Sequence, residues 1–128
     1  MAHLYIIRGV PGSGKTTLAN KMINCGMAND HFEADMFMVN TDGEYHFDRN
    51  RLGECHANCM SAVKNSLASG RSVIVSNTFT RRWEYQNYQI MAQEFGIDCT
   101  IIVCQGNFKN IHGVPRQDVQ RMRDRFEY

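Results

Sequence analysis

The chain has 128 residues, of which 43% are hydrophobic and 21% are charged, enough for one compact domain and too few for two ordinary ones. Its formal net charge of +1 argues against a protein that holds nucleic acid or a membrane surface nonspecifically through one basic face. No apolar run approaches the roughly 20 residues that span a bilayer, so we expect no membrane segment. Five cysteines, an odd number partly placed in apolar runs, are typical of buried thiols in a reducing compartment, which indicates a cytoplasmic protein.

Hydrophobic patterning predicts strands that alternate with helices along the chain. A β-prone run at 4–7 leads into a glycine loop and then into a helix at 17–23. A short strand and turn are expected at 32–39. From Asp48 a helix of about twenty residues follows, and it closes at Gly70.

The second half of the chain continues this alternation. The runs at 72–76 and 100–104 are apolar throughout, as in strands that are buried on both faces of a parallel sheet. Between them a helix is expected at 81–95, capped by Thr80, and a last helix is expected at 116–126. Strands separated by helices imply an α/β fold, a small parallel sheet flanked by helices.

Residues 9–16, Gly-Val-Pro-Gly-Ser-Gly-Lys-Thr, fit the phosphate-loop pattern Gly-x-x-x-x-Gly-Lys-Ser/Thr between the first expected strand and helix. Glycines let successive backbone N–H groups converge on a phosphate, and the following helix adds its own N–H groups and positive dipole end. Lys15 is expected to follow the β- and γ-phosphates, and the Thr16 hydroxyl to ligate Mg²⁺. ATP and Mg²⁺ are therefore the expected cofactors. The residues expected to bind ATP are Gly9, Pro11, Gly12, Ser13, Gly14, Lys15, Thr16 and Thr17.

The end of the strand at 72–76 bears on the kind of phosphate-loop protein this is. A motor or a hydrolysing switch normally has an acidic residue there, whereas this chain has Ser76, Asn77 and Thr78. Because ligands of open α/β sheets bind at the carboxyl ends of strands, Asn77 and Thr78 are candidates to contact an acceptor. The chain is therefore interpreted as a small P-loop NTPase of kinase type.

Asp35 is the candidate general base. It lies in the second strand-to-helix connection, which faces the phosphate loop in compact kinases of this type, and a carboxylate there can accept the proton of an attacking hydroxyl. A surface or helix-capping aspartate is the alternative. Glu33 is expected to be exposed as readily as buried, and Asp42 and Asp48 fit turn and cap positions.

Basic residues supply the remaining candidates. Arg81 stands at the start of a helix, where it is placed to contact an acceptor phosphate, although a solvated pair with Arg82 is the commoner role. The polar stretch 106–116 has the position of a kinase lid, whose cations close over the phosphates and exclude water. An ordinary solvent loop is the alternative. The candidate cations of the lid are Lys109, His112 and Arg116, of which Lys109 and Arg116 are expected to act in catalysis.

Two further patterns have alternative interpretations. Cys55-His56-x-x-Cys59 has the residue types of a metal site, but it lies within one expected helix without a second ligand pair, which favours core thiols. The aromatic residues Trp83, Tyr85 and Tyr88 suit stacking on bases, and their helical spacing fits packing at least as well.

Together these residues resemble a known family. The phosphate loop, Asp35, a Tyr45-x-Phe47 stretch before a helix carrying His56, Ser76-Asn77-Thr78 with Trp83-Glu84 after it, and His112-Gly113-Val114-Pro115-Arg116 resemble the polynucleotide 5′-hydroxyl kinases of bacteriophage type and the related AAA-domain polynucleotide-kinase-like proteins. The likeness covers nearly the whole chain. The chain departs from the family pattern at 36–38, where a second acid or an arginine is frequent, at Asn77, where an aspartate is common, and at Lys109, where an arginine is typical.

The resemblance implies transfer of the ATP γ-phosphate to the 5′-hydroxyl end of DNA or RNA by a stand-alone kinase domain over residues 1–128 with a lid at 106–116. By the same likeness Lys15 and Thr16 meet the phosphates, Asp35 is the general base, and Asn77 and Thr78 contact the acceptor strand. The near-neutral charge predicts a short, single-stranded footprint with a shallow salt dependence. A kinase for a nucleoside, nucleotide or sugar, and a nucleotide-binding module without transfer, stay open as alternatives, and no protein partner is inferred.

Overall fold

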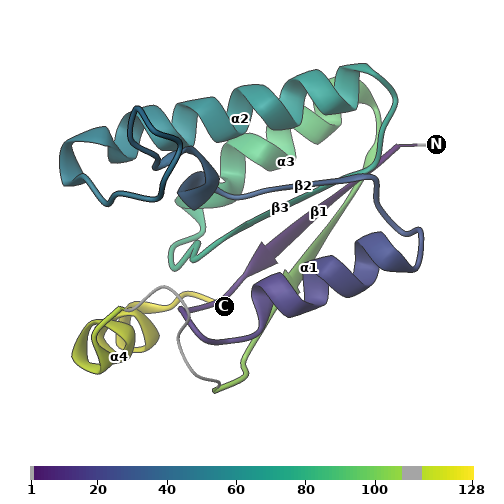
Figure 1. Ribbon diagram of the computed structural model, residues 1–128. Helices are drawn as coiled ribbons and strands as arrows, with labels where there is room; N and C mark the ends of the chain where they lie inside the picture. Colours follow the sequence, from purple (N-terminus) through teal and green to yellow (C-terminus); the bar gives the residue numbers. More distant parts are fainter. Residues whose placement is uncertain (1, 108–113) are drawn as a thin grey trace.

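The computed structural model describes residues 2–107 and 114–128, and within them one sheet of four parallel strands lies between helices (Figure 1). The strands are ordered β2-β3-β1-β4 across the sheet. Their bounds are β1 His3–Arg8, β2 Asp30–Phe32, β3 Val73–Asn77 and β4 Asp98–Val103. The α-helices are α1 Lys15–Asn24, α2 Leu52–Ala68, α3 Trp83–Phe95 and α4 Arg116–Arg125, and short 3-10 helices cover Ala34–Phe37 and Arg49–Arg51.

Side-chain alternation along the central strands builds a core on each face of the sheet. Leu4 and Ile6 of β1 point to the face covered by α2 and α3, where Val73 and Val75 of β3 join them. Ile7 and Ile74 point to the opposite face and pack against Ala19 and Met22 of α1. Figure 1 shows this layering, with α2 and α3 on one side of the strands and α1 on the other. The predicted parallel α/β fold is confirmed.

Several predicted boundaries were wrong, for local physical reasons. The strand expected at 32–39 is only Asp30–Phe32, because the chain then turns into the 3-10 helix Ala34–Phe37. The helix expected at 81–95 begins at Trp83, and Thr80 does not cap it, because the Thr80 hydroxyl bonds the Glu84 carboxylate instead.

The strand expected at 100–104 is Asp98–Val103. It pairs with β1 alone within the described part of the chain, so it is an edge strand rather than a buried one, and Ile101 is 37% exposed. The remaining elements were predicted to within a few residues. In the described part of the chain, no helix has the length and apolar character needed to cross a membrane.

A buried arginine joins the end of β1 to the last residues of the chain. Arg8 is 1% exposed, and its Nε donates to the Phe79 carbonyl at 3.0 Å while its guanidinium donates to the Glu127 carbonyl. The guanidinium carbon lies 4.6 Å from the ring centroids of both Tyr85 and Phe126. Burial lowers the pKa of Arg8, and the nearby Tyr85 and Glu127 oppose the shift. The chain after α4 is thereby packed next to the residue that precedes the phosphate loop.

Candidate active site

The phosphate loop leaves β1 at Gly9 and enters α1 at Lys15. Gly12 and Gly14 have positive φ angles of 82° and 100°, a backbone conformation that favours glycine. A Cβ on Gly9 would come within 2.2 Å of the Ser13 Oγ and 2.8 Å of the Cys104 carbonyl oxygen, so the loop closes tightly over this position. The glycines of the sequence motif are therefore required by the geometry of the loop.

The start of α1 differs from the starts of the other α-helices. Gly14, like the N-caps of the other α-helices, provides no side-chain cap, but the first turn of α1 contains no acidic residue. The first turns of α2, α3 and α4 contain Glu54, Glu84 and Asp118. The buried Ser13 hydroxyl likewise has no hydrogen-bond partner within the described residues. Unsatisfied N–H groups and a free hydroxyl fit the oxygens of a nucleotide phosphate.

Lys15 lies at the centre of this site. Its Nζ donates to the Val10 carbonyl of the loop at 3.1 Å. Burial lowers the pKa of Lys15, and the charges of two nearby carboxylates, Glu33 ahead of Asp35, oppose the shift. The ammonium group is therefore held in the loop with two carboxylates in electrostatic range.

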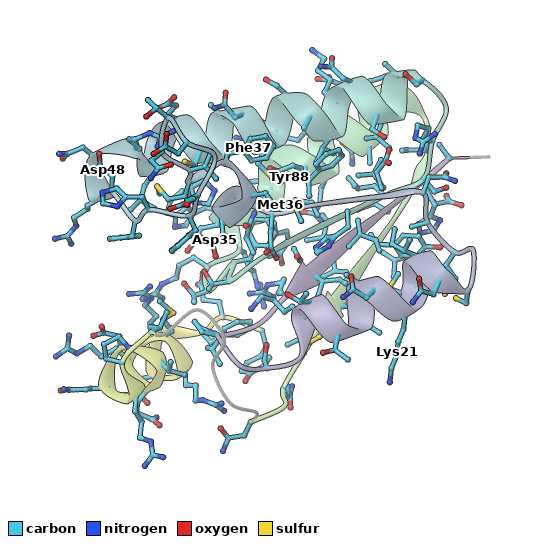
Figure 2. All side chains as sticks on the ribbon, viewed as in Figure 1. Lys21, Asp35, Met36, Phe37, Asp48 and Tyr88 are labelled. Atoms are coloured by element: carbon cyan, nitrogen blue, oxygen red, sulfur yellow. The ribbon has the colours of Figure 1, made fainter. Side chains whose placement is uncertain are left out.

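Asp35 lies on the 3-10 helix that follows β2, and the end of β3 holds this helix in place. The Asn77 Oδ1 accepts a hydrogen bond of 2.9 Å from the backbone N–H of Ala34. The charge of Asp35 acts both on Lys15 and on Tyr45, whose pKa is raised mainly by burial and further by Asp35. In Figure 2 Asp35 lies on the side of the helix toward the phosphate loop and α4, whereas Phe37 lies toward α2.

The connection from Met38 to Asp48 carries two exposed aromatic side chains, of which Tyr45 lies within electrostatic range of Asp35. Val39 and Tyr45 form an antiparallel bridge, and the Arg51 guanidinium fixes the connection by donating to the Val39 carbonyl at 2.6 Å. Tyr45 is 52% and Phe47 is 58% exposed. As predicted, Asp48 is a cap, because its Oδ1 accepts from the Asn50 N–H at 3.0 Å. The aromatic rings therefore offer a stacking surface on an anchored segment.

Glu33 lies in the site, although the sequence analysis assigned it no role. Its side chain is only 14% exposed, and its Oε2 accepts a hydrogen bond of 3.2 Å from the Ser76 hydroxyl. His31 approaches the same oxygen at 3.8 Å. The signal for it is the spacing of His31 and Glu33, because residues two apart in a strand share a face of the sheet.

The residues predicted to contact an acceptor and those predicted as lid cations occupy different settings. The Asn77 amide oxygen accepts from the Ala34 N–H, and the Thr78 carbonyl accepts from the Gly9 N–H at 3.2 Å, so these two residues help to hold the 3-10 helix and the phosphate loop in place. Arg81 is exposed, and its backbone N–H donates to Glu84. Arg116 is exposed at the first position of α4. Lys109 and His112 lie outside the described residues, as does most of the predicted lid.

The other two sequence patterns belong to the core. Cys55 and Cys59 are fully buried, which raises the pKa of each thiol, while His56 is exposed. Tyr85 and Tyr88 are buried with their rings edge-on to Phe79, whereas Trp83 is 71% exposed at the start of α3. The packing interpretation is therefore correct for the two cysteines and the two tyrosines.

The donor atoms near the loop fit a magnesium ion that is bound together with a nucleotide. Thr16 stands in the first turn of α1, and Glu33 and Asp35 provide carboxylates just after β2, at the same edge of the sheet. The described residues contain no cluster of three or more His, Cys, Asp or Glu that could hold a metal alone. Such a donor set suits Mg²⁺, which in nucleotide sites takes few protein ligands and relies on the phosphates.

The parallel sheet, the loop after β1 and the helix that it caps define a P-loop NTPase fold of kinase type. Residues 4–110 match the family described as AAA domain, and the chain belongs to this family. NEDD4-binding protein 2 of Homo sapiens is 28% identical over 135 residues, which cover 97% of this chain and 8% of that protein. The chain thus spans less than a tenth of the length of this relative.

Solved structures share the fold. A chain of the Pnkp1/Rnl/Hen1 RNA repair complex superposes with a TM-score of 0.67 at 21% identity, covering 96% of this chain and 37% of that one. The APS kinase CysC of Mycobacterium tuberculosis, in complex with AMPPNP and APS, gives a TM-score of 0.62 at 18% identity, covering 94% of this chain and 67% of that one. At these identities the likeness shows the fold alone.

Proposed function

We propose that the chain is an ATP- and Mg²⁺-dependent phosphotransferase that transfers the γ-phosphate of ATP to the 5′-hydroxyl end of DNA or RNA. The observation that carries the proposal is the position of Asp35. It lies on a 3-10 helix that Asn77 holds in place, and its carboxylate acts electrostatically on Lys15. A carboxylate beside a phosphate loop is what a kinase needs and a simple nucleotide holder does not.

In this proposal the phosphate loop binds the nucleotide and Asp35 acts on the acceptor. The N–H groups of residues 9–16 and the Lys15 ammonium bind and orient the phosphates, and Asp35 accepts the proton of the attacking hydroxyl. Mg²⁺, held by the Thr16 hydroxyl together with the phosphates, neutralises charge on the transferred group. Residues 1–128 form a single kinase domain, in which residues 106–116 act as a lid. Lys109 and Arg116 are the cations of the lid, and Arg81 contacts the acceptor.

Exposed rings beside the base support a polynucleotide acceptor. Tyr45 and Phe47 are more than half exposed on the segment next to Asp35, and stacking of a base on an aromatic ring contributes about 1–3 kcal/mol. The similarity in fold to a chain of an RNA repair complex points the same way. With a net charge of +1, binding would rest on a few contacts at the strand end and depend weakly on salt.

The test uses γ-labelled ATP and Mg²⁺ with a 5′-hydroxyl oligonucleotide, the same oligonucleotide already 5′-phosphorylated, and a mixture of nucleosides and sugars. We expect label on the 5′-hydroxyl oligonucleotide alone. Lys15→Ala should lose both ATP binding and transfer. Asp35→Asn should keep ATP affinity and lower kcat by roughly 100- to 10,000-fold, the range for removal of a general base.

Three outcomes would change the proposal in different ways. Label only on small molecules would replace the acceptor with one such as that of APS kinase, whose fold this chain shares. Full transfer by Asp35→Asn would remove Asp35 from its role. ATP binding without label on any acceptor would leave a nucleotide-binding module.

A further inference from the structure

Glu33 has no role in the transfer proposed above, although it is buried beside the phosphate loop. It directly follows β2, and its side chain is 14% exposed. Among the charges that act on the Lys15 ammonium, that of Glu33 has the largest effect, ahead of Asp35. An acidic side chain kept from water in this way needs a partner of opposite charge.

The register of the sheet shows which way Glu33 faces. His31 pairs with Ile74, and Ser76 pairs with Ile7. Ile7 and Ile74 belong to the core on the α1 side of the sheet, so His31 and Ser76 lie on that side as well. Glu33, two residues after His31, shares it. This is the side of the sheet from which Lys15 and Thr16 begin α1.

A short hydrogen-bonded chain fixes the carboxylate. The Ser76 hydroxyl donates to the Glu33 Oε2 at 3.2 Å, and the His31 Nε2 lies 2.6 Å from the Ser76 Oγ. Because the single hydroxyl proton is used toward Glu33, the His31 Nε2 is the donor to Ser76. The carboxylate of Glu33 is thus oriented by β3, although it belongs to the end of β2.

The carboxylate of Glu33 lies beside the end of β3, where an acidic residue is missing. In many phosphate-loop proteins an acidic residue at the end of such a strand completes the binding of Mg²⁺. Here that strand ends in Ser76 and Asn77, which carry no charge, and the Asn77 oxygen is turned to Ala34. Glu33 provides a carboxylate at the same edge of the sheet, where it accepts a hydrogen bond from Ser76, the residue before Asn77.

We propose that Glu33 is a positioning residue for the Mg²⁺ of the bound nucleotide, acting through the water shell of the metal while Thr16 is the direct ligand. The proposal rests on the ATP binding proposed above, and not on the identity of the acceptor. It assigns the two carboxylates different tasks, Glu33 toward the nucleotide and its metal, and Asp35 toward the acceptor hydroxyl.

The experiment measures binding of the ATP analogue AMPPNP to the full chain, with no acceptor, across a Mg²⁺ titration and in EDTA. Glu33→Gln keeps an oxygen that can accept from Ser76 and removes the charge. We expect its Kd in EDTA to be unchanged or up to a few-fold tighter, because a negative charge near the phosphates is gone. The Mg²⁺ concentration for half-maximal binding should rise about 10- to 100-fold, the effect of losing an outer-sphere metal partner.

Matched variants separate this role from others. Thr16→Ala should raise the Mg²⁺ requirement as well, whereas Glu94→Gln, which removes an exposed carboxylate on α3, should leave both measurements unchanged. Should Glu33→Gln fail to fold, Ser76→Ala keeps the charge and removes its hydroxyl donor. We expect that variant to raise the Mg²⁺ requirement by a smaller factor.

Wild-type Mg²⁺ dependence in Glu33→Gln would overturn the proposal. Equal weakening of binding with and without Mg²⁺ would also overturn it, since Glu33 would then only hold Lys15. A wild-type chain that binds AMPPNP with Mg²⁺ and phosphorylates no acceptor would defeat the proposed function and leave the role of Glu33 intact.

Discussion

β1 and β2 end at the same edge of the sheet, on either side of β3, yet the segments that follow them build their parts of the site in different ways. After β1 the chain supplies backbone: the N–H groups of residues 9–16, shaped by the positive φ angles of Gly12 and Gly14. After β2 the chain supplies side chains, Glu33 and Asp35. Glu33 is tied directly to Ser76, and Asp35 is tied to Asn77 through the backbone of Ala34, each contact joining residues 43 apart.

The difference shows how each kind of site tolerates change. A cradle of N–H groups depends on conformation, so it is sensitive to any added atom and insensitive to the identity of many side chains. A pair of carboxylates depends on charge and orientation, so it is sensitive to isosteric changes at the carboxylates themselves and at their anchors. Substitutions that separate shape from charge therefore test the comparison.

Gly9→Ala is expected to have the largest effect, because it adds an atom where the loop has no room. The new Cβ would meet the Ser13 Oγ at 2.2 Å and the Cys104 carbonyl oxygen at 2.8 Å, and the second of these is backbone. Such overpacking costs about 1–3 kcal/mol of folding free energy. A displaced loop should also lower transfer roughly 100-fold. Urea unfolding measures the first effect and transfer of label from γ-labelled ATP the second, and AMPPNP binding shows whether the loop still holds the nucleotide.

The control for this variant is Gly53→Ala in α2. A Cβ there meets nothing within 4 Å, and Gly53 lies inside a helix. We expect this variant to be more stable than wild type by about 0.5–1 kcal/mol, with unchanged nucleotide binding. Unimpaired AMPPNP binding by Gly9→Ala would mean that the loop does not need the conformation described above.

The same contrast explains how much the sequence could reveal. The phosphate loop, its flanking strand and helix and the parallel sheet were predictable because contiguous residues carry the glycine spacing and the hydrophobic period. Asp35 was predictable as a candidate by its position in the chain. For Glu33 the spacing from His31 indicates only a shared face of the sheet. Its burial was not predictable, because it depends on Ser76 and on a β2 that ends at Phe32, where the sequence suggested a longer strand. The anchoring role of Asn77 likewise depends on a contact far away in sequence.

Asn77→Ala tests the anchor of the 3-10 helix and is expected to have an intermediate effect. It removes the acceptor of the Ala34 N–H at 2.9 Å, which costs about 1–2 kcal/mol of stability. With Asp35 less firmly placed, kcat should fall about tenfold while AMPPNP affinity stays at the wild-type value. Asn77→Asp is the matched variant, because its carboxylate retains an oxygen for Ala34, and it should be closer to wild type in stability. Loss of AMPPNP affinity in Asn77→Ala would instead connect Asn77 to the phosphate loop.

The smallest effect is expected at the opposite end of β2, where a charged pair supports the fold and lies away from the phosphates. The Asp30 carboxylate accepts from the Arg71 Nε at 2.7 Å and from a second guanidinium nitrogen at 3.0 Å, and it also accepts from the Ser66 hydroxyl. The hydrogen bond from Arg71 is the main reason that the pKa of Asp30 lies below its ordinary value of 3.8. Because the pKa is lower in the folded chain, the carboxylate adds stability at pH values above 3.8 and loses that contribution as the pH falls through the folded-state pKa.

Asp30→Asn should therefore lower the Tm by about 1–3 °C at pH 7, since exposed pairs contribute little, and the difference from wild type should shrink below about pH 4. Transfer at pH 7 and 25 °C should be unchanged, and a fall in kcat would show that charge at this end of the strand also reaches the site.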